Sequence, residues 1–202
     1  MYGTSSRSGR SAKIVWIVIL ILIVLIGGKY VFDFFFPYEC ENYIEPTAEK
    51  YEVDPVLIYS MCNAGSNFKK NIETTEDAQG VMQVSYQTLE DLYKEFGISK
   101  EKNISDPQNN IEYGTKIMAY LLKRYNGDEF TALAAFKAGT VAVDGWLGDS
   151  IYSKDGKALQ STPYDKVTQY CKKTILNKKV YSALMKIHHI GDKEEEEASS
   201  VA

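Results

Sequence analysis

Three short segments of this 202-residue chain carry the residues that could take part in chemistry. They are residues 65–68 (Gly-Ser-Asn-Phe), residues 80–83 (Gly-Val-Met-Gln) and residues 134–139 (Ala-Ala-Phe-Lys-Ala-Gly). Between the first two lie Glu73, Glu76 and Asp77, whose carboxyl groups are of the type that acts in general acid and base catalysis. Carboxylates on a loop more often form a solvated face and keep low pKa values, so both interpretations stay open.

The cysteines and histidines lack the spacing of a metal site. Cys40, Cys62 and Cys171 form no Cys-x-x-Cys pair, and His188 and His189 are adjacent to each other. We therefore expect no metal and no cofactor. Cys40 and Cys171 are the conceivable disulfide pair, and three unpaired thiols are the simpler alternative.

The three segments resemble the signature blocks of the soluble lytic transglycosylase (SLT) domain family, lysozyme-like enzymes that cleave bacterial peptidoglycan. The family has Glu-Ser-x-Phe in the first block, and its Glu is the catalytic acid. Gly65 stands at that position here. The resemblance covers about residues 44–185 and includes two further blocks, which are Asp106-Pro107 with Asn110-Ile111 and Gly114, and Pro163-Tyr164 through Tyr170.

The family's chemistry, as the resemblance implies it, depends on this single acid. It protonates the glycosidic oxygen between N-acetylmuramic acid and N-acetylglucosamine, and then helps the muramic C6 hydroxyl to attack, which gives a 1,6-anhydro product. No second carboxylate is needed, in contrast to most glycosidases. Gly65 has no proton to transfer, so the resemblance predicts that the protein has no catalytic residue at this position.

The third block also departs from the family, which has Ala-Tyr-Asn-Ala-Gly where this chain has Phe136 and Lys137 in place of the Tyr and Asn. A cation at 137 would lower the pKa of a neighbouring carboxyl group. Carbohydrate contact could survive without catalysis, and core packing is the alternative role for Met82 and Phe68. The predicted substrate-binding residues are Ser66, Met82, Gln83, Phe136, Lys137 and Tyr170.

An apolar run begins at Ile14 and continues without a charge to Gly28. With Lys29 at an interface and the aromatic residues after it, the run predicts a transmembrane anchor over residues 14–36. Arg7, Arg10 and Lys13 precede it, so the N-terminus is expected in the cytoplasm. A cleaved signal peptide is the alternative, although no small-x-small cleavage site follows Gly28.

The remaining sequence predicts one mainly α domain with at most a small β-hairpin. Asp54-Pro55 and Asp106-Pro107 are typical helix starts, and further helices are expected over residues 87–96, 130–138 and 164–186, the last as one or two helices. The predicted organisation is a cytoplasmic tail (1–13), the anchor (14–36), the SLT-like domain (37–190) and a disordered acidic tail (191–202).

These observations predict a single-pass protein of the bacterial cell membrane whose SLT-like domain lies outside the cytoplasm. We expect it to bind peptidoglycan glycan strands as a catalytically dead or impaired scaffold, with the proteins of a cell-wall machine as possible partners. The alternative is an active lytic transglycosylase whose acid is Glu73, Glu76 or Asp77. The net charge of −4 gives no indication of nucleic-acid binding.

Overall fold

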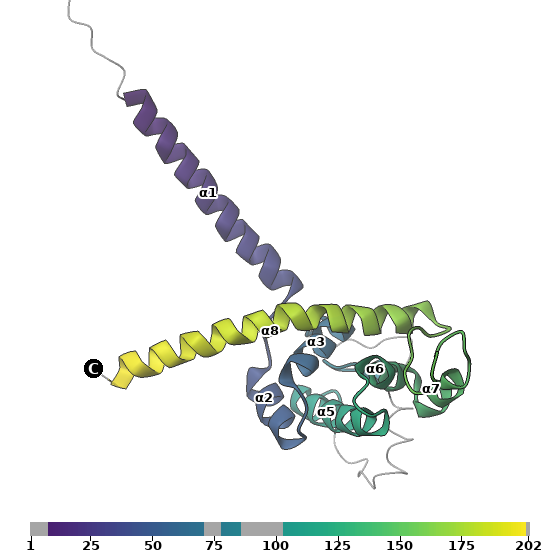
Figure 1. The fold of residues 1–202 in the computed structure, drawn as a ribbon. Coiled ribbons are helices and arrows are strands. Elements are labelled where there is room, and N and C mark those ends of the chain that lie inside the picture. The colour runs from purple at the N-terminus through teal and green to yellow at the C-terminus, as the bar shows by residue number, and fades with distance from the viewer. Residues whose placement is uncertain (1–7, 71–77, 86–102, 201–202) are drawn as a thin grey trace, which may run out of the picture. The chain divides into compact units, whose positions relative to one another are not determined.

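The computed structural model describes residues 8–70, 78–85 and 103–200. Its contacts divide the chain into two units, Met1–Pro37 and Tyr38–Ala202, which are described separately here. The described residues form helices and one two-stranded sheet (Figure 1). This confirms the predicted fold class, a mainly α domain with a small β-hairpin and one N-terminal apolar helix.

The first unit is a single helix, α1 (Ser8–Phe35), whose apolar segment Ile14–Phe35 is long enough to cross a membrane. Its described side chains are mostly exposed Ile, Val, Leu and Phe, as the sequence pattern for an anchor predicts. Lys29 and Asp33, one turn apart near its end, form an ion pair of 2.6 Å. The helix begins at Ser8, within residues 1–13, which we expected to form the cytoplasmic tail.

The second unit begins with α2 (Glu41–Lys50), which we did not predict because Pro46 lies inside it. The expected starts at Asp54 and Asp106 are confirmed for α3 (Pro55–Ser66) and α5 (Pro107–Arg124). In both helices the Asp side chain accepts a hydrogen bond from a backbone amide of the first turn, and Pro occupies the first position. Helix α6 (Glu129–Ala138) begins in the same way at Asp128.

The hairpin pairs β1 (Ala78–Gln79) with β2 (Val84–Ser85) in antiparallel register, with Ala78 opposite Ser85. Only residues 80–83 connect the two strands, so the second sequence segment is the turn of this hairpin. The helix expected over residues 87–96 lies outside the described residues. The short helix α7 (Thr140–Leu147) follows α6 directly.

The unit closes with α8 (Asp165–Ser200), which is one helix and packs against α3 and α6 (Figure 1). Its buried Tyr181 stacks on Tyr59 of α3, with ring centroids 5.8 Å apart. The structure differs from the expected disordered tail, because α8 continues as helix to Ser200. A run of Glu has good helix propensity, and it extends a helix that is already formed. Cys40, Cys62 and Cys171 are free thiols.

Candidate functional site

Gly65 lies in the last turn of α3, which ends at Ser66 with Asn67 as a left-handed cap. The glycine is half-buried, and a Cβ added to it would lie 3.4 Å from Gln83 Cγ and 3.5 Å from the Met82 carbonyl oxygen. These are ordinary van der Waals distances. A side chain at position 65 would therefore extend from a regular helix toward the turn of the hairpin.

Ser66 ties this end of α3 to the hairpin. Its hydroxyl donates a hydrogen bond of 2.6 Å to the Val81 carbonyl, and it lies 3.2 Å from the Cys62 carbonyl of its own helix. The side chain is buried. The predicted substrate-binding hydroxyl is thus engaged with backbone carbonyl groups and holds the turn against the helix.

Asn110, near the start of α5, also holds the hairpin turn, on which Ser66 of α3 acts from another helix. Its Oδ1 accepts a hydrogen bond of 2.8 Å from the Met82 amide, and its Nδ2 donates to the carbonyls of Gln79 (2.8 Å) and Ile104 (2.9 Å). The side chain is fully buried. We did not include Asn110 among the site residues, although its place in an Asn-Ile pair of the fourth sequence block was the available signal.

Two glycines let these elements approach each other closely. Gly80 has φ +74°, and a Cβ there would collide with the Asn110 amide. A Cβ at Gly114 of α5 would collide with the sulfur of Met82. Met82 is consequently packed in the core, as is Phe68, which agrees with the packing role that we kept as an alternative for both residues.

Gln83 ends the turn in a left-handed conformation, with φ 56°. Its Nε2 donates a hydrogen bond of 2.9 Å to the Gly80 carbonyl, and the side chain is buried. The structure therefore brings four residues together at one place: Gly65, Ser66, Met82 and Gln83. We call this arrangement, with Gly80, Asn110 and Gly114, the hairpin frame.

The other three predicted residues lie where α6 packs on α8. Phe136 is buried, whereas Lys137 is half-buried and places its ammonium group 5.2 Å from the centre of the Tyr170 ring, a cation–π contact. Burial raises the pKa of Tyr170, and interaction with Cys171 and with Cys62 of α3 raises it further. The buried Tyr170 hydroxyl has no hydrogen-bond partner among the described residues.

None of the acidic side chains whose burial is described is buried. Within residues 8–70, 78–85 and 103–200, the buried polar side chains whose burial is described are hydroxyls and amides, and no Asp or Glu is among them. Glu73, Glu76 and Asp77 lie outside the described residues. In the same part of the chain no group of His, Cys, Asp and Glu could hold a metal ion. The described site thus offers amide, aromatic and cationic groups.

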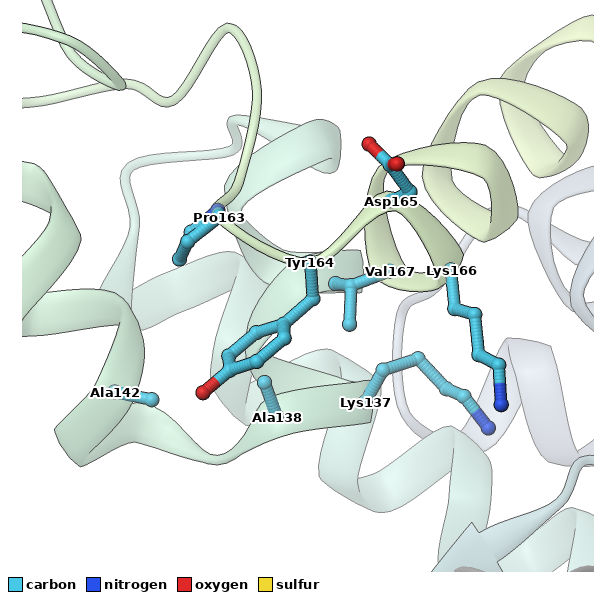
Figure 2. Close-up of a pocket in the computed structure, with 8 residues that line it drawn as sticks. All are labelled: Lys137, Ala138, Ala142, Pro163, Tyr164, Asp165, Lys166 and Val167. Atoms are coloured by element: carbon cyan, nitrogen blue, oxygen red, sulfur yellow. The ribbon is translucent and has the colours of Figure 1, made fainter.

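A pocket of about 710 Å³ opens beside Lys137, between the end of α6, α7 and the start of α8 (Figure 2). Its lining adds Tyr164 and Lys166, which sequence reasoning did not select as site residues. The available signal was their position in the Pro-Tyr-Asp-Lys segment that opens α8. This group, defined by Lys137, Tyr164 and Lys166, is called the lysine pocket below.

Comparison with known proteins agrees with this geometry. Residues 42–159 match the model of the transglycosylase SLT domain. The chain is 25% identical over 138 residues to the soluble lytic murein transglycosylase of Escherichia coli K12, covering 66% of this chain and 21% of that protein. It is 32% identical over 120 residues to the membrane-bound lytic murein transglycosylase C of Photorhabdus laumondii, covering 56% of this chain and 34% of the relative.

Among solved structures, an inactive mutant of the lytic transglycosylase Slt from Pseudomonas aeruginosa superposes with a TM-score of 0.64 at 22% identity. This match covers 76% of the present chain and 25% of that one. The chain thus spans about a fifth to a third of the length of these relatives. Since the domain model covers more than half of the chain and the fold agrees, the protein belongs to the transglycosylase SLT domain family.

Proposed function

We propose that this protein is a membrane-anchored SLT-domain protein that binds peptidoglycan glycan strands without cleaving them. The observation that carries the proposal is Gly65. It stands where the family's Glu is expected, on a regular helix that faces the hairpin turn. The residues around Gly65 are hydrogen-bonded and closely packed. The backbone position that would carry the acid is therefore held in place, although it carries no acidic side chain.

The chemistry explains why this one residue matters. A general acid for glycoside cleavage must be protonated near neutral pH, which for a carboxylic acid requires an environment that raises its pKa. Burial is the usual cause, and no Asp or Glu is found buried in the described part of the chain. Lys137 would act in the opposite direction on a carboxyl group near it.

The membrane topology is part of the same proposal. Helix α1 has the length and composition of a membrane span. Arg7, Arg10 and Lys13 precede its apolar segment Ile14–Phe35. Positive charges favour the cytoplasmic side, which would place Tyr38–Ala202 outside the cytoplasm, where peptidoglycan lies. Protease added to intact spheroplasts should then degrade this unit, whereas its protection would show the reverse orientation.

The decisive experiment compares the unchanged chain with Gly65→Glu and with Gly65→Gln as the matched uncharged control. Each full chain, in detergent, is incubated with purified peptidoglycan, and mass spectrometry measures 1,6-anhydromuramic products, while co-sedimentation measures binding. We expect binding by all three proteins and products from Gly65→Glu alone. Release of products by the unchanged chain would overturn the proposal.

In that case the alternative enzyme hypothesis would be tested directly. The changes Glu73→Gln, Glu76→Gln and Asp77→Asn would be made one at a time in the unchanged background. Loss of product in one of them would identify a relocated acid. If Gly65→Glu binds but gives no product, the Phe136 and Lys137 differences have also removed activity, and the glycan-binding role remains.

A further inference from the structure

The lysine pocket combines an apolar wall with an exposed aromatic ring. Ala138 and Ala142 line one side, Val167 lies opposite, and the Tyr164 ring extends across the space between them (Figure 2). Tyr164 is 62% exposed, and its ring lies 5.8 Å from that of Trp146 on α7. Ligand pockets usually pair such apolar surface with a few polar groups that fix orientation. The flat, C–H-rich face of a sugar ring suits an exposed aromatic ring.

Two ammonium groups from different helices line this pocket, together with Asp165 and the Tyr164 hydroxyl. Lys137 extends from the end of α6 and Lys166 from the first turn of α8, and both side chains end on the same side of the pocket (Figure 2). The carboxylate of Asp165 points away from them (Figure 2). The Tyr170 ring holds the Lys137 ammonium group through the cation–π contact, so one of the two charges has a defined place before any ligand binds.

Two convergent ammonium groups favour a ligand that carries negative charge. Lysine acts as a compact point charge toward carboxylate and phosphate. If the domain binds peptidoglycan as proposed above, the sugar with a carboxylate is the muramic acid unit, whose lactyl group is a carboxylate when no peptide is attached. N-acetylglucosamine has no such group. Two ammonium groups would therefore favour the muramic acid unit over N-acetylglucosamine.

We infer that the lysine pocket binds a carboxylate-bearing saccharide, with Tyr164 against the sugar ring and Lys137 and Lys166 on the carboxylate. The inference rests on the proposed glycan-binding function and makes it more specific. It predicts a preference for peptide-free muramyl glycan over a neutral glycan of the same length. Phosphate-bearing wall polymers would meet the same two charges and are a separate outcome of the test.

The test measures binding of the full chain, in detergent, by isothermal titration calorimetry. The probes are a peptide-free muramyl tetrasaccharide, neutral chitotetraose and a glycerol-phosphate oligomer. We expect the muramyl glycan to bind about tenfold more tightly than chitotetraose, because two partly exposed ion pairs each contribute modestly. The preference should shrink as salt concentration rises.

Variants then assign the preference to this pocket. The double change Lys137→Gln and Lys166→Gln should remove the preference, so that the muramyl glycan binds no more tightly than chitotetraose. The double change Lys157→Gln and Lys179→Gln, the same loss of charge elsewhere, should keep the tenfold preference. Changing both pocket lysines to Arg should restore it. Tyr164→Ala should weaken the binding of both glycans by the same factor. Thermal unfolding by circular dichroism confirms that each variant is folded.

Two results would overturn the inference and leave glycan binding intact. One is equal affinity of the unchanged chain for the muramyl glycan and chitotetraose. The other is a muramyl preference that persists in the Lys137→Gln and Lys166→Gln double variant. Tighter binding of the glycerol-phosphate oligomer than of either glycan would also reject it, in favour of a phosphate polymer. Failure of both glycans to bind would reject the glycan-binding function itself.

Discussion

The hairpin frame and the lysine pocket differ in how they are built. The frame is buried, and its backbone is held by Asn110 from α5 and by Ser66 from α3. The pocket is open, and its lining includes Tyr164 and two lysines at the ends of helices. By the resemblance given above, the frame would keep the residue types of the family blocks apart from Gly65, whereas the pocket side would carry Phe136 and Lys137 in place of Tyr and Asn.

One region sets the shape of the site and the other can select the ligand, two roles that a single active site usually combines. Buried hydrogen bonds and close glycine contacts set the shape of the frame, and changing them should cost stability. Exposed charges at the pocket contribute little to folding and can determine which ligand binds. Substitutions in the two regions should therefore give opposite results in stability and in binding, and the following predictions test this separation.

The largest loss of stability is expected for Asn110→Ala. It would leave the Met82 amide and the carbonyls of Gln79 and Ile104 buried without this partner. At about 1–3 kcal/mol for each unsatisfied group, partly relieved by relaxation, unfolding free energy should fall by about 4 kcal/mol. Urea unfolding of the full chain in detergent, followed by circular dichroism, measures it. The neighbouring Asn109→Ala is the control and should cost less than about 1 kcal/mol.

Alanine substitutions at two glycines distinguish the stability cost of backbone strain from the cost of a steric clash. Gly80 and Gly127 both have positive φ, +74° and +81°. A Cβ at Gly80 collides with Asn110, whereas a Cβ at Gly127 has no atom of the described residues within 4 Å apart from its chain neighbours. Gly80→Ala should cost about 3 kcal/mol, and Gly127→Ala about 1 kcal/mol from strain alone. Equal losses in the same urea assay would mean that the frame is not closely packed.

Lys178 of α8 forms ion pairs with Glu129 of α6 and with Asp54, the N-cap of α3. Its ammonium group lies 2.5 Å from Glu129 and 3.1 Å from Asp54, and its side chain is 22% exposed. Lys178→Met should cost about 1 kcal/mol, the upper end for ion pairs near a surface. Gln at the same position is the polar control and should lose nearly as much.

The same ion pairs predict a pH dependence. Burial lowers the pKa of Lys178, but the hydrogen bonds to Glu129 and Asp54 raise it more, so it lies above its ordinary value of 10.5. A raised lysine pKa means that its stabilisation is complete below the unfolded pKa and is lost as pH rises through the folded pKa. The stability difference between wild type and Lys178→Met should thus be constant from pH 7 to 9 and shrink above pH 10.5. Growth of the difference at alkaline pH would contradict this assignment.

Gly65→Ala should increase stability. The position is inside a helix without positive φ, and a Cβ there meets only ordinary contacts. Replacing a helical glycine with alanine is worth about 0.5–1 kcal/mol. Gly145→Ala in α7 is the matched control and should give a similar gain, because a Cβ there meets no atom of the structurally described segments within 4 Å outside its own helix backbone. A loss at position 65 alone would show that the frame does not accommodate a side chain there.

The smallest effect is expected at the lysine pocket. The Lys137→Gln and Lys166→Gln double variant should change unfolding free energy by about 0.5 kcal/mol, mainly through the cation–π contact with Tyr170. Thermal unfolding in detergent measures this change. A loss of unfolding free energy as large as that of Asn110→Ala would contradict the proposed difference between the hairpin frame and the lysine pocket.

The sequence predicted those features that depend on short-range signals. Asp54-Pro55 and Asp106-Pro107 marked helix starts because a capping Asp and a first-turn Pro act locally. The apolar run identified α1 for the same reason. Helix α2 was missed because Pro46 is a local signal against helix, and tertiary packing of its buried Ile44 and Ala48 outweighs it.

The site was predicted less completely, because its geometry depends on contacts between distant segments. Ser66 was expected to face substrate, but its hydroxyl bonds to Val81, a partner that the sequence does not reveal. Tyr164 and Lys166 enter the site only because α8 starts beside the end of α6. Asn110 was visible as part of a motif, but its three backbone hydrogen bonds required the structure.

The way in which Asn110 holds the hairpin turn has a practical consequence for measurement. Asn110 of α5 holds the turn independently of position 65, and a Cβ at that position meets only ordinary contacts. The first atom of a side chain can therefore be added there without moving the turn. Differences among such variants report on chemistry more than on folding. If the unchanged chain releases no product, as proposed, it would serve as a low-background scaffold on which the catalytic contribution of a single added functional group is measured.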